Sequence, residues 1–263
     1  MEIFKPVGKA YNILQKNFYW KVYYKKFGNP FIHYHVCFRY FQKYVHTKLE
    51  RAKVLDLGCG DGTYINELAY KYQITGYGVD NMPNRINQAS QVAESLKSRL
   101  KFSVDDITTN PKINGKFDLG ICFDVLEHLE TSQVDAVLKI CAKHIKPGGI
   151  LVIRVPYGND QKYIGKPQKF TYGKDEHKVA GFTFKRIKKL LGKYGFEIDI
   201  VKFQFYWLAQ INYEISEMIR SYSKVLYSVY SLLFRWVSFI EIYTPILSFG
   251  RKNGMMIVSR RIR

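Results

Sequence analysis

Cysteine is scarce in this chain, and its copies are far apart. The four cysteines lie at positions 37, 59, 122 and 141, without the C-x-x-C spacing of a zinc site or the density of a disulfide framework. His33 and His35 alternate in an aromatic stretch that supplies no further metal ligands. The sequence therefore predicts no metal site and a protein of a reducing cytosol.

Acidic residues are also few, 22 against 41 Lys and Arg, which gives a formal net charge of +19. The excess is uneven, because residues 1–50 carry +7, residues 51–160 are neutral and residues 161–263 carry +12. The positive charge thus belongs to the two flanks. It indicates an anionic partner, with a phosphate-bearing substrate, an anionic membrane and nucleic acid as the candidates.

No apolar run is long and uncharged enough to predict a membrane-spanning helix. Residues 225–249 are mostly apolar but contain Arg235, Glu241 and Pro245, whereas a spanning helix needs about 20 apolar residues with few charges. The N-terminus lacks the continuous apolar run of a signal peptide. We therefore expect a cytoplasmic protein that meets a membrane, if at all, peripherally on its inner face.

Three glycines, at positions 58, 60 and 62, follow an apolar strand predicted over residues 54–57 and precede a helical pattern. Glycine permits a tight turn and a close backbone approach to a nucleotide at a helix N-terminus. Dinucleotide sites use G-x-G-x-x-G, whereas this chain has G-x-G-x-G preceded by the acidic Asp56. That spacing resembles the first motif of the class I S-adenosylmethionine-dependent methyltransferases.

Four further elements of that family follow in order between about residues 50 and 200. A second strand ends in Asp80, a third ends in Asp105-Asp106-Ile107, a fourth leads into Asp124-Val-Leu-Glu-His128, and Pro147-Gly-Gly149 enters a fifth. The resemblance implies S-adenosyl-L-methionine as the cofactor, with an acidic group on the ribose hydroxyls. It assigns the cofactor to Asp56, Gly58, Cys59, Gly60, Asp80, Asn81, Asp106, Ile107 and Phe123.

The register at the end of the third strand, Asp105-Asp106-Ile107, is ambiguous. In the family, an Asp at this point meets the adenine amino group and the next residue packs on the ring. Asp106 and Ile107 fit this description better than Asp105, and a shift of one residue either way stays open.

Strands and helices alternate strictly over residues 51–156, which predicts a parallel sheet with right-handed crossovers. The resemblance implies an α/β, Rossmann-like sheet of seven strands in the order 3-2-1-4-5-7-6, with strand 7 antiparallel. Thr183 is predicted to cap a basic helix over residues 184–194, and residues 196–205 to form the sixth strand. The predicted parts are an aromatic helical cap (1–50), the methyltransferase core (51–205), a helical insertion (206–250), and the last core strand with a basic tail (251–263).

The predicted insertion carries one apolar stripe with a strict 3,4 spacing, as expected of a long helix or a helix pair. Its members are Leu208, Ile211, Ile215, Met218, Tyr222, Val225, Val229, Leu232 and Trp236. Three interpretations stay open. The stripe packs on the N-terminal helices as a lid, lies in a membrane interface, or forms the seam of a homodimer.

The end of the fourth strand lacks the Asn/Asp-Pro-Pro-Tyr/Phe motif of many enzymes that methylate amino groups, and no Pro-Cys nucleophile is present. These absences favour a small-molecule, lipid or sugar acceptor methylated through oxygen. Asp124-Val-Leu-Glu-His128 resembles a version found in ubiquinone- and menaquinone-type methyltransferases and in enzymes of surface-polysaccharide clusters.

Two histidines are the candidate catalytic bases. Histidine is a side chain that can act as a base near neutral pH, so His128 is one candidate, although a structural role in the loop is equally consistent with its place. His177 lies in a passage that resembles the loop over the acceptor pocket in the same subgroup.

We expect a methyltransferase that acts on a hydroxyl of a sugar, a lipid-linked glycan or an apolar small molecule near a membrane surface. A quinone or isoprenoid acceptor is the first alternative. An RNA acceptor, which would explain the charge of +19, and a non-catalytic partner-binding subunit are the others.

Overall fold

The computed structural model describes residues 49–158, 181–204 and 254–262, together with Val45 and separate residues between 215 and 233. His177 and most of the predicted N-terminal cap and insertion lie outside the described residues. The predicted boundaries of those two parts therefore stay predictions.

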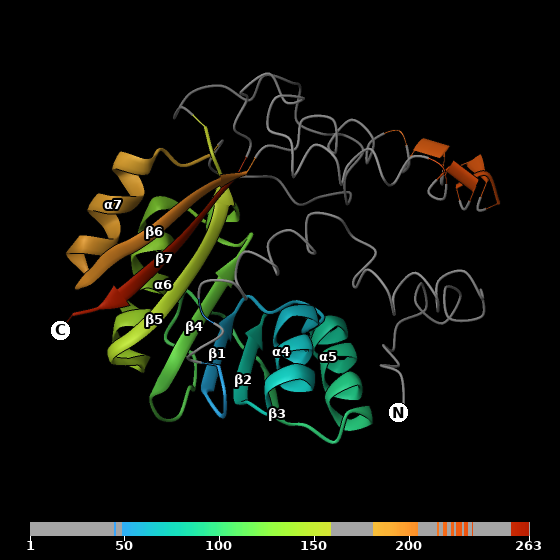
Figure 1. Ribbon diagram of the computed structural model, residues 1–263, viewed down its shortest axis with the longest axis horizontal. Helices are drawn as coiled ribbons and strands as arrows, with labels where there is room; N and C mark the ends of the chain where they lie inside the picture. The colour runs from blue at the N-terminus through green and yellow to red at the C-terminus, as the bar shows by residue number, and fades with distance from the viewer. Residues whose placement is uncertain are drawn as a thin grey trace.

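The described elements alternate along the chain (Figure 1). They are β1 (Lys53–Leu57), α4 (Thr63–Tyr72), β2 (Thr75–Asp80), α5 (Pro83–Ser95), β3 (Arg99–Val104), β4 (Phe117–Phe123), the 3-10 helix η2 (Leu126–His128), α6 (Thr131–His144), β5 (Ile145–Pro156), α7 (Phe184–Lys193), β6 (Phe196–Gln204) and β7 (Gly254–Arg261).

The sheet has seven strands in the order β3-β2-β1-β4-β5-β7-β6. β1 runs parallel to β2 and β4, whereas β7 runs antiparallel to both β5 and β6. The predicted strand order and the antiparallel last strand are therefore confirmed. Since β1 to β5 are parallel, the carboxyl ends of all five strands meet at one edge of the sheet, where ligands of such folds bind.

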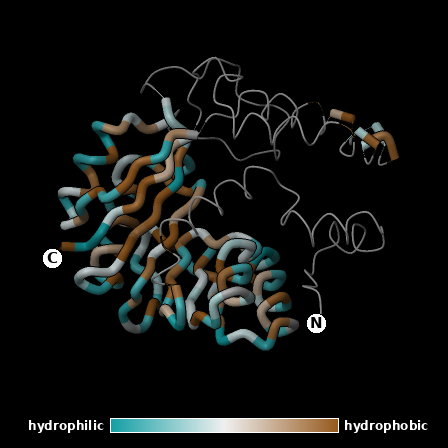
Figure 2. The backbone as a smooth tube through the Cα atoms, viewed as in Figure 1, coloured by the Kyte–Doolittle hydropathy of each residue, from teal (hydrophilic) through white to brown (hydrophobic). Residues whose placement is uncertain are grey.

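Helices cover both faces of the sheet. On one face, Val134, Leu138 and Ile187 of α6 and α7 pack with the strands in one core cluster. On the other face, Ile65 and Leu68 of α4 belong to a second cluster, and α5 lies beside α4 and β3 (Figure 1). Among the residues coloured in Figure 2, hydrophobic ones gather along the central strands, as expected for parallel strands buried on both faces.

Pro147-Gly-Gly149 was predicted to lead into the fifth strand, but it lies inside β5. Strand β5 begins directly after α6, and Ile145 already pairs with Phe117. The register then shifts, so that Leu119 pairs with Ile150. The Pro-Gly-Gly residues therefore form a bulge inside the strand, where Gly148 adopts φ +75.

The helix that follows β5 was predicted correctly. Thr183 Oγ1 accepts a hydrogen bond from Arg186 N at 3.2 Å, which caps α7. Phe182, just before this cap, forms a parallel bridge with Tyr157 after β5. The N-terminus of α7 thus lies at the carboxyl edge of the sheet. Within the described part of the chain, no helix is long and apolar enough to cross a membrane.

Candidate active site

The glycine turn after β1 is fixed by its backbone. Gly58 N and Cys59 N both donate to Val79 O, at 2.8 and 3.0 Å, which ties the turn to β2. Gly58 adopts φ +72, and a Cβ at this position would overlap Val125 Cγ2. At Gly60, φ +55, a Cβ would meet nothing closer than the Arg85 side chain at 3.6 Å. Gly58 is therefore needed for packing, whereas Gly60 leaves an open approach to the backbone.

Asp56, on β1 before this turn, is buried with an exposed fraction of 3%. Its Oδ2 has no hydrogen-bond partner among the described residues. Burial, reinforced by the nearby carboxylates of Asp80 and Asp61, raises the pKa of Asp56 to about 8. A ligand with a donor or a positive charge would satisfy this carboxyl group.

Asp80 lies at the end of β2 and holds the turn from the other side. Its Oδ2 accepts from Gly60 N and its Oδ1 from Met82 N, each at 2.9 Å. A carboxylate oxygen has room for more than one hydrogen bond. Asp80 is half-buried, so it can still accept hydroxyl donors from a ligand at the edge.

The two neighbouring aspartates after β3, Asp105 and Asp106, differ in their hydrogen bonds. Both oxygens of Asp105 accept backbone N–H groups, from Asp106 at 2.9 Å and from Lys112 at 2.9 Å. Asp106 is exposed and uses Oδ1 for Thr108. Its Oδ2 accepts no hydrogen bond from the described residues, which favours the register in which Asp106 is the cofactor residue.

The other predicted cofactor residues differ in exposure. Asn81 is exposed and Ile107 is buried. Phe123 is 7% exposed and packs its ring edge-to-face on Tyr64, with centroids 4.7 Å apart. Met82, which no sequence motif singled out, is 44% exposed and donates its backbone N–H to Asp80 Oδ1, so it is a further candidate for contact with a ligand. An apolar residue shortly after the acidic end of the second strand was the available signal for it.

A charged cluster lies beyond the glycine turn, where β4 and β5 end. Asp124 adopts φ +56 and donates its N–H to Arg154 O at 3.1 Å. The Arg154 guanidinium, 6% exposed, forms an ion pair with the Asp124 carboxylate. Glu127 is 2% exposed, and its Oε2 has no hydrogen-bond partner among the described residues.

The three charges influence one another. Burial raises the pKa of Glu127 well above its usual range; Asp124 adds to this effect, and Arg154 opposes it. We call Asp124, Glu127 and Arg154 the charged corner. Glu127 lies within the sequence motif Asp124-Val-Leu-Glu-His128, whereas the sequence did not single out Arg154, because the spacing of a strand does not show which distant residue its side chain will pair with.

Of the two predicted catalytic histidines, His128 lies among the described residues and His177 does not. His128 follows Glu127 at the end of η2, is half-buried, and donates its backbone N–H to Val125 O at 3.1 Å. His177 lies outside the described residues. Tyr157, another residue at this edge, stacks edge-to-face on Phe203 with centroids 4.9 Å apart.

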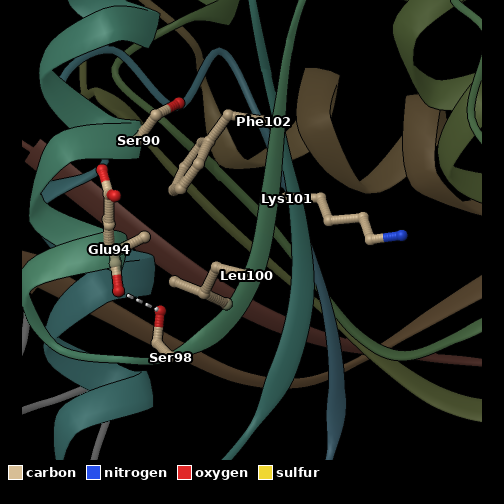
Figure 3. A pocket seen from close by; sticks show the side chains of 7 residues that line it. Ser90, Glu94, Ser98, Leu100, Lys101 and Phe102 are labelled. Carbon is tan, nitrogen blue, oxygen red and sulfur yellow. Dashed lines mark hydrogen bonds between the residues drawn. The ribbon is translucent and has the colours of Figure 1, made fainter.

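A separate surface pocket of about 420 Å³ lies between α5 and β3 (Figure 3). Ser98 Oγ, at its end, donates to Ala93 O at 3.2 Å, and Lys101 points away from α5. No group of the glycine turn or the charged corner lines this pocket. We therefore place the active site at the carboxyl edge and not here.

We call the glycine turn after β1, together with Asp56, Asp80 and Asp106, the cradle. Three observations indicate that the cradle fits an adenosyl sulfonium cofactor. The turn presents open backbone at Gly60, Asp56 has an unpartnered buried oxygen, and acidic side chains end both β2 and β3. A positively charged ligand with ribose hydroxyls would match these acidic, hydrogen-bond-accepting side chains, whereas a phosphate would face three acidic side chains. Burial, aided by Asp56, also raises the pKa of the Cys59 thiol, so Cys59 is no nucleophile here.

Known proteins resemble this chain in its core. Residues 54–149 match the family model described as "Methyltransferase domain". A ubiquinone biosynthesis O-methyltransferase of Coxiella burnetii is 33% identical over 124 residues, which are 46% of this chain and 52% of that protein. The chain thus spans about half the length of this relative.

Two solved structures share the fold. A putative sarcosine dimethylglycine methyltransferase from Galdieria sulphuraria has a TM-score of 0.63 at 16% identity, with 86% of this chain and 85% of that one covered. Magnesium protoporphyrin IX methyltransferase from Synechocystis, with bound SAH, has a TM-score of 0.54 at 18% identity and covers 93% of this chain and 87% of its own.

Proposed function

We propose that this protein is a class I S-adenosylmethionine-dependent methyltransferase, which methylates a hydroxyl of a sugar, a lipid-linked glycan or another apolar small molecule near a membrane surface. One observation carries the proposal: an acidic, open cradle at β1 to β3 adjoins a buried charged corner at β4 and β5. Bound S-adenosylmethionine supplies an electrophilic methyl group. The chain must orient the acceptor, exclude water and accept a proton.

In this proposal the cradle residues hold the cofactor. Asp80 accepts the ribose hydroxyls, and Asp106 accepts from the adenine through its remaining oxygen. Met82 and Ile107 flank the ring. Asp56 faces the positive end of the cofactor, where its own burial makes a cationic neighbour favourable.

The charged corner and the two histidines form the acceptor side. Arg154 neutralises Asp124 and keeps the end of β4 in its left-handed conformation. His128 or His177 accepts the hydroxyl proton. His128 is supported by its place directly after the buried Glu127, and His177 by the resemblance of its loop.

A quinone or isoprenoid acceptor is the second candidate, favoured by the similarity to a protein named for ubiquinone biosynthesis. The shared segment covers 46% of this chain, and the remaining part includes the segments expected to select the acceptor. The similarity therefore supports methyl transfer more strongly than it supports any acceptor.

The cofactor assignment is tested by calorimetry with S-adenosylhomocysteine. We expect micromolar-range binding by the wild type and a loss of about 10- to 100-fold in Asp80→Ala, because a hydrogen bond to a charged group contributes about 1.5–3 kcal/mol. Asp135→Ala is the matched control, since it removes an aspartate that pairs with Lys193 away from the site. Unchanged binding in Asp80→Ala would remove the ribose assignment.

The acceptor is identified by transfer of a labelled methyl group. The protein is incubated with labelled S-adenosylmethionine and with separate lipid, glycan and RNA fractions of a cell extract. Label in a glycan or lipid-linked glycan supports the first candidate, and label in a quinone supports the second. Methylation of RNA that persists when the reaction is run near physiological salt would overturn both candidates.

A further inference from the structure

A positively charged side chain lies across the glycine turn after β1. Arg85 belongs to the first turn of α5, where its backbone N–H donates to Met82 O at 3.0 Å. The atoms nearest to a Cβ placed on Gly60 would be Arg85 Nη1 at 3.6 Å and Arg85 Cδ at 3.9 Å. Because both atoms belong to one side chain, Arg85 extends over Gly60 from its Cδ to its guanidinium.

The guanidinium of Arg85 has no ion pair and no hydrogen bond within the described part of the chain. The aspartates around the turn have other partners. Asp61 accepts from Thr63 N at 3.1 Å and from Thr63 Oγ1 at 2.6 Å, and Asp80 accepts two backbone N–H groups at 2.9 Å. Since Arg85 is half-buried, it holds a set of hydrogen-bond donors beside the turn that these residues leave unused.

The two neighbouring hydroxyls of a ribose need both kinds of hydrogen-bond partner. Each hydroxyl has one donor and two acceptor lone pairs, and a carboxylate can only accept. Asp80 therefore satisfies the hydroxyl donors and leaves the lone pairs without a partner. Arg85 offers donors in a planar fork, and both side chains border Gly60. Together they match a ribose in a way that neither does alone.

We propose that Arg85 is a second ribose-binding residue, which donates hydrogen bonds to the oxygens of the hydroxyl groups whose protons Asp80 accepts. The inference deepens the proposed function and rests on its assignment of S-adenosylmethionine to the cradle. The carboxylate of the cofactor is the competing partner for a guanidinium. The ribose is favoured because α5 directly follows β2, the strand that ends in Asp80.

Calorimetry on the full chain compares the wild type with Arg85→Met, which keeps most of the length of the side chain and removes its donors. S-adenosylhomocysteine should bind about tenfold more weakly to the variant, near the lower limit for a hydrogen bond to a charged group. Methylthioadenosine has the ribose but no amino-acid group, so its affinity should fall by the same factor. The melting temperature without ligand should stay unchanged, since Arg85 loses no side-chain partner among the described residues.

Competition against S-adenosylhomocysteine with adenosine and with dideoxyadenosine isolates the two hydroxyl groups. The wild type should prefer adenosine, and Arg85→Met should reduce this preference about tenfold, because dideoxyadenosine lacks the oxygens that the guanidinium would contact. Arg99→Met is the matched control. Arg99 is an exposed arginine of β3 that donates to Gln73 O at 3.3 Å, so its loss should leave the preference as it is in the wild type.

Three results would overturn the inference alone. The first is unchanged binding of both adenosyl ligands to Arg85→Met. The second is a loss confined to S-adenosylhomocysteine, which would assign Arg85 to the carboxylate of the cofactor. The third is an equal loss for adenosine and dideoxyadenosine, which would assign Arg85 to the adenine. All three require a wild type that binds S-adenosylhomocysteine, whereas a wild type that does not bind it would overturn the proposed function and this inference with it.

Discussion

The two halves of the carboxyl edge differ in the burial and the pairing of their polar groups. At β1 to β3, the site consists of backbone groups and of Asp80 and Asp106, which reach solvent. At β4 and β5, the side chains of Glu127 and Arg154 are buried, and Arg154 is paired with Asp124. The first half depends on local geometry, which motif spacing encodes. The second depends on a pair 30 residues apart in sequence, which only the register of two strands brings together.

The largest effect is expected in the charged corner. Arg154→Met removes the cation and leaves two carboxyl groups at the end of β4. Removal of one partner of a buried pair costs about 3–5 kcal/mol, and we expect roughly 3 kcal/mol here because the Asp124 side chain is 35% exposed. The free energy of unfolding in urea measures this loss.

Lys193→Met is the control for Arg154→Met. It breaks an ion pair whose lysine side chain is 58% exposed, and exposed pairs contribute about 0–1 kcal/mol. Equal losses in the two variants would show that the corner is not a buried electrostatic unit, and the contrast between the two halves would fail.

The difference between the halves also explains what the sequence could predict. The strand order and the cradle residues were predicted from the family resemblance, which short motifs carry, and the cap at Thr183 from a capping side chain, so all of these signals are local. Arg154 lies in an otherwise apolar strand, so its charge contradicts the pattern that identified the strand. The bulge at Gly148 was missed because a Pro-Gly-Gly sequence is equally compatible with a turn.

The second prediction compares two glycines with the same backbone strain. Gly58 and Gly148 have φ +72 and +75, but only at Gly58 would a Cβ meet another atom, on Val125. Both alanine variants bear the left-handed strain of about 1–2 kcal/mol. Gly58→Ala should lose about 1–3 kcal/mol more through overpacking, and Val125→Ala should recover part of this extra loss. Similar melting temperatures for the two single variants would contradict the packing role of Gly58.

The third prediction concerns pH and Asp56. Because the folded pKa is about 8 and the usual value is 3.8, the folded chain keeps a proton that the unfolded chain releases between these values. The stability that this proton provides is complete below pH 4 and is lost as pH rises through about 8. Between pH 6 and 7.5, the ligand-free wild type should lose about 2 kcal/mol more than Asp56→Asn, since each pH unit contributes about 1.4 kcal/mol.

Chemical denaturation of both proteins across this pH range measures the difference. The buried Glu127 acts in the same direction in both proteins, so it cancels in the comparison. Parallel profiles would mean that Asp56 is ionised throughout the range, and the cradle would then be a preformed anionic site.

The smallest effect distinguishes the two aspartates after β3. Asp106→Ala removes a carboxylate with one oxygen available to a ligand, so S-adenosylhomocysteine affinity should fall about tenfold, near the lower limit for a hydrogen bond to a charged group. Asp105→Ala removes a carboxylate whose oxygens both accept backbone groups, so it should lower the melting temperature and change affinity less. Calorimetry and thermal melts on the same pair of variants separate the two roles. The reverse result would move the adenine contact to Asp105, and the open half of the site would then depend on a residue that also holds its own loop together.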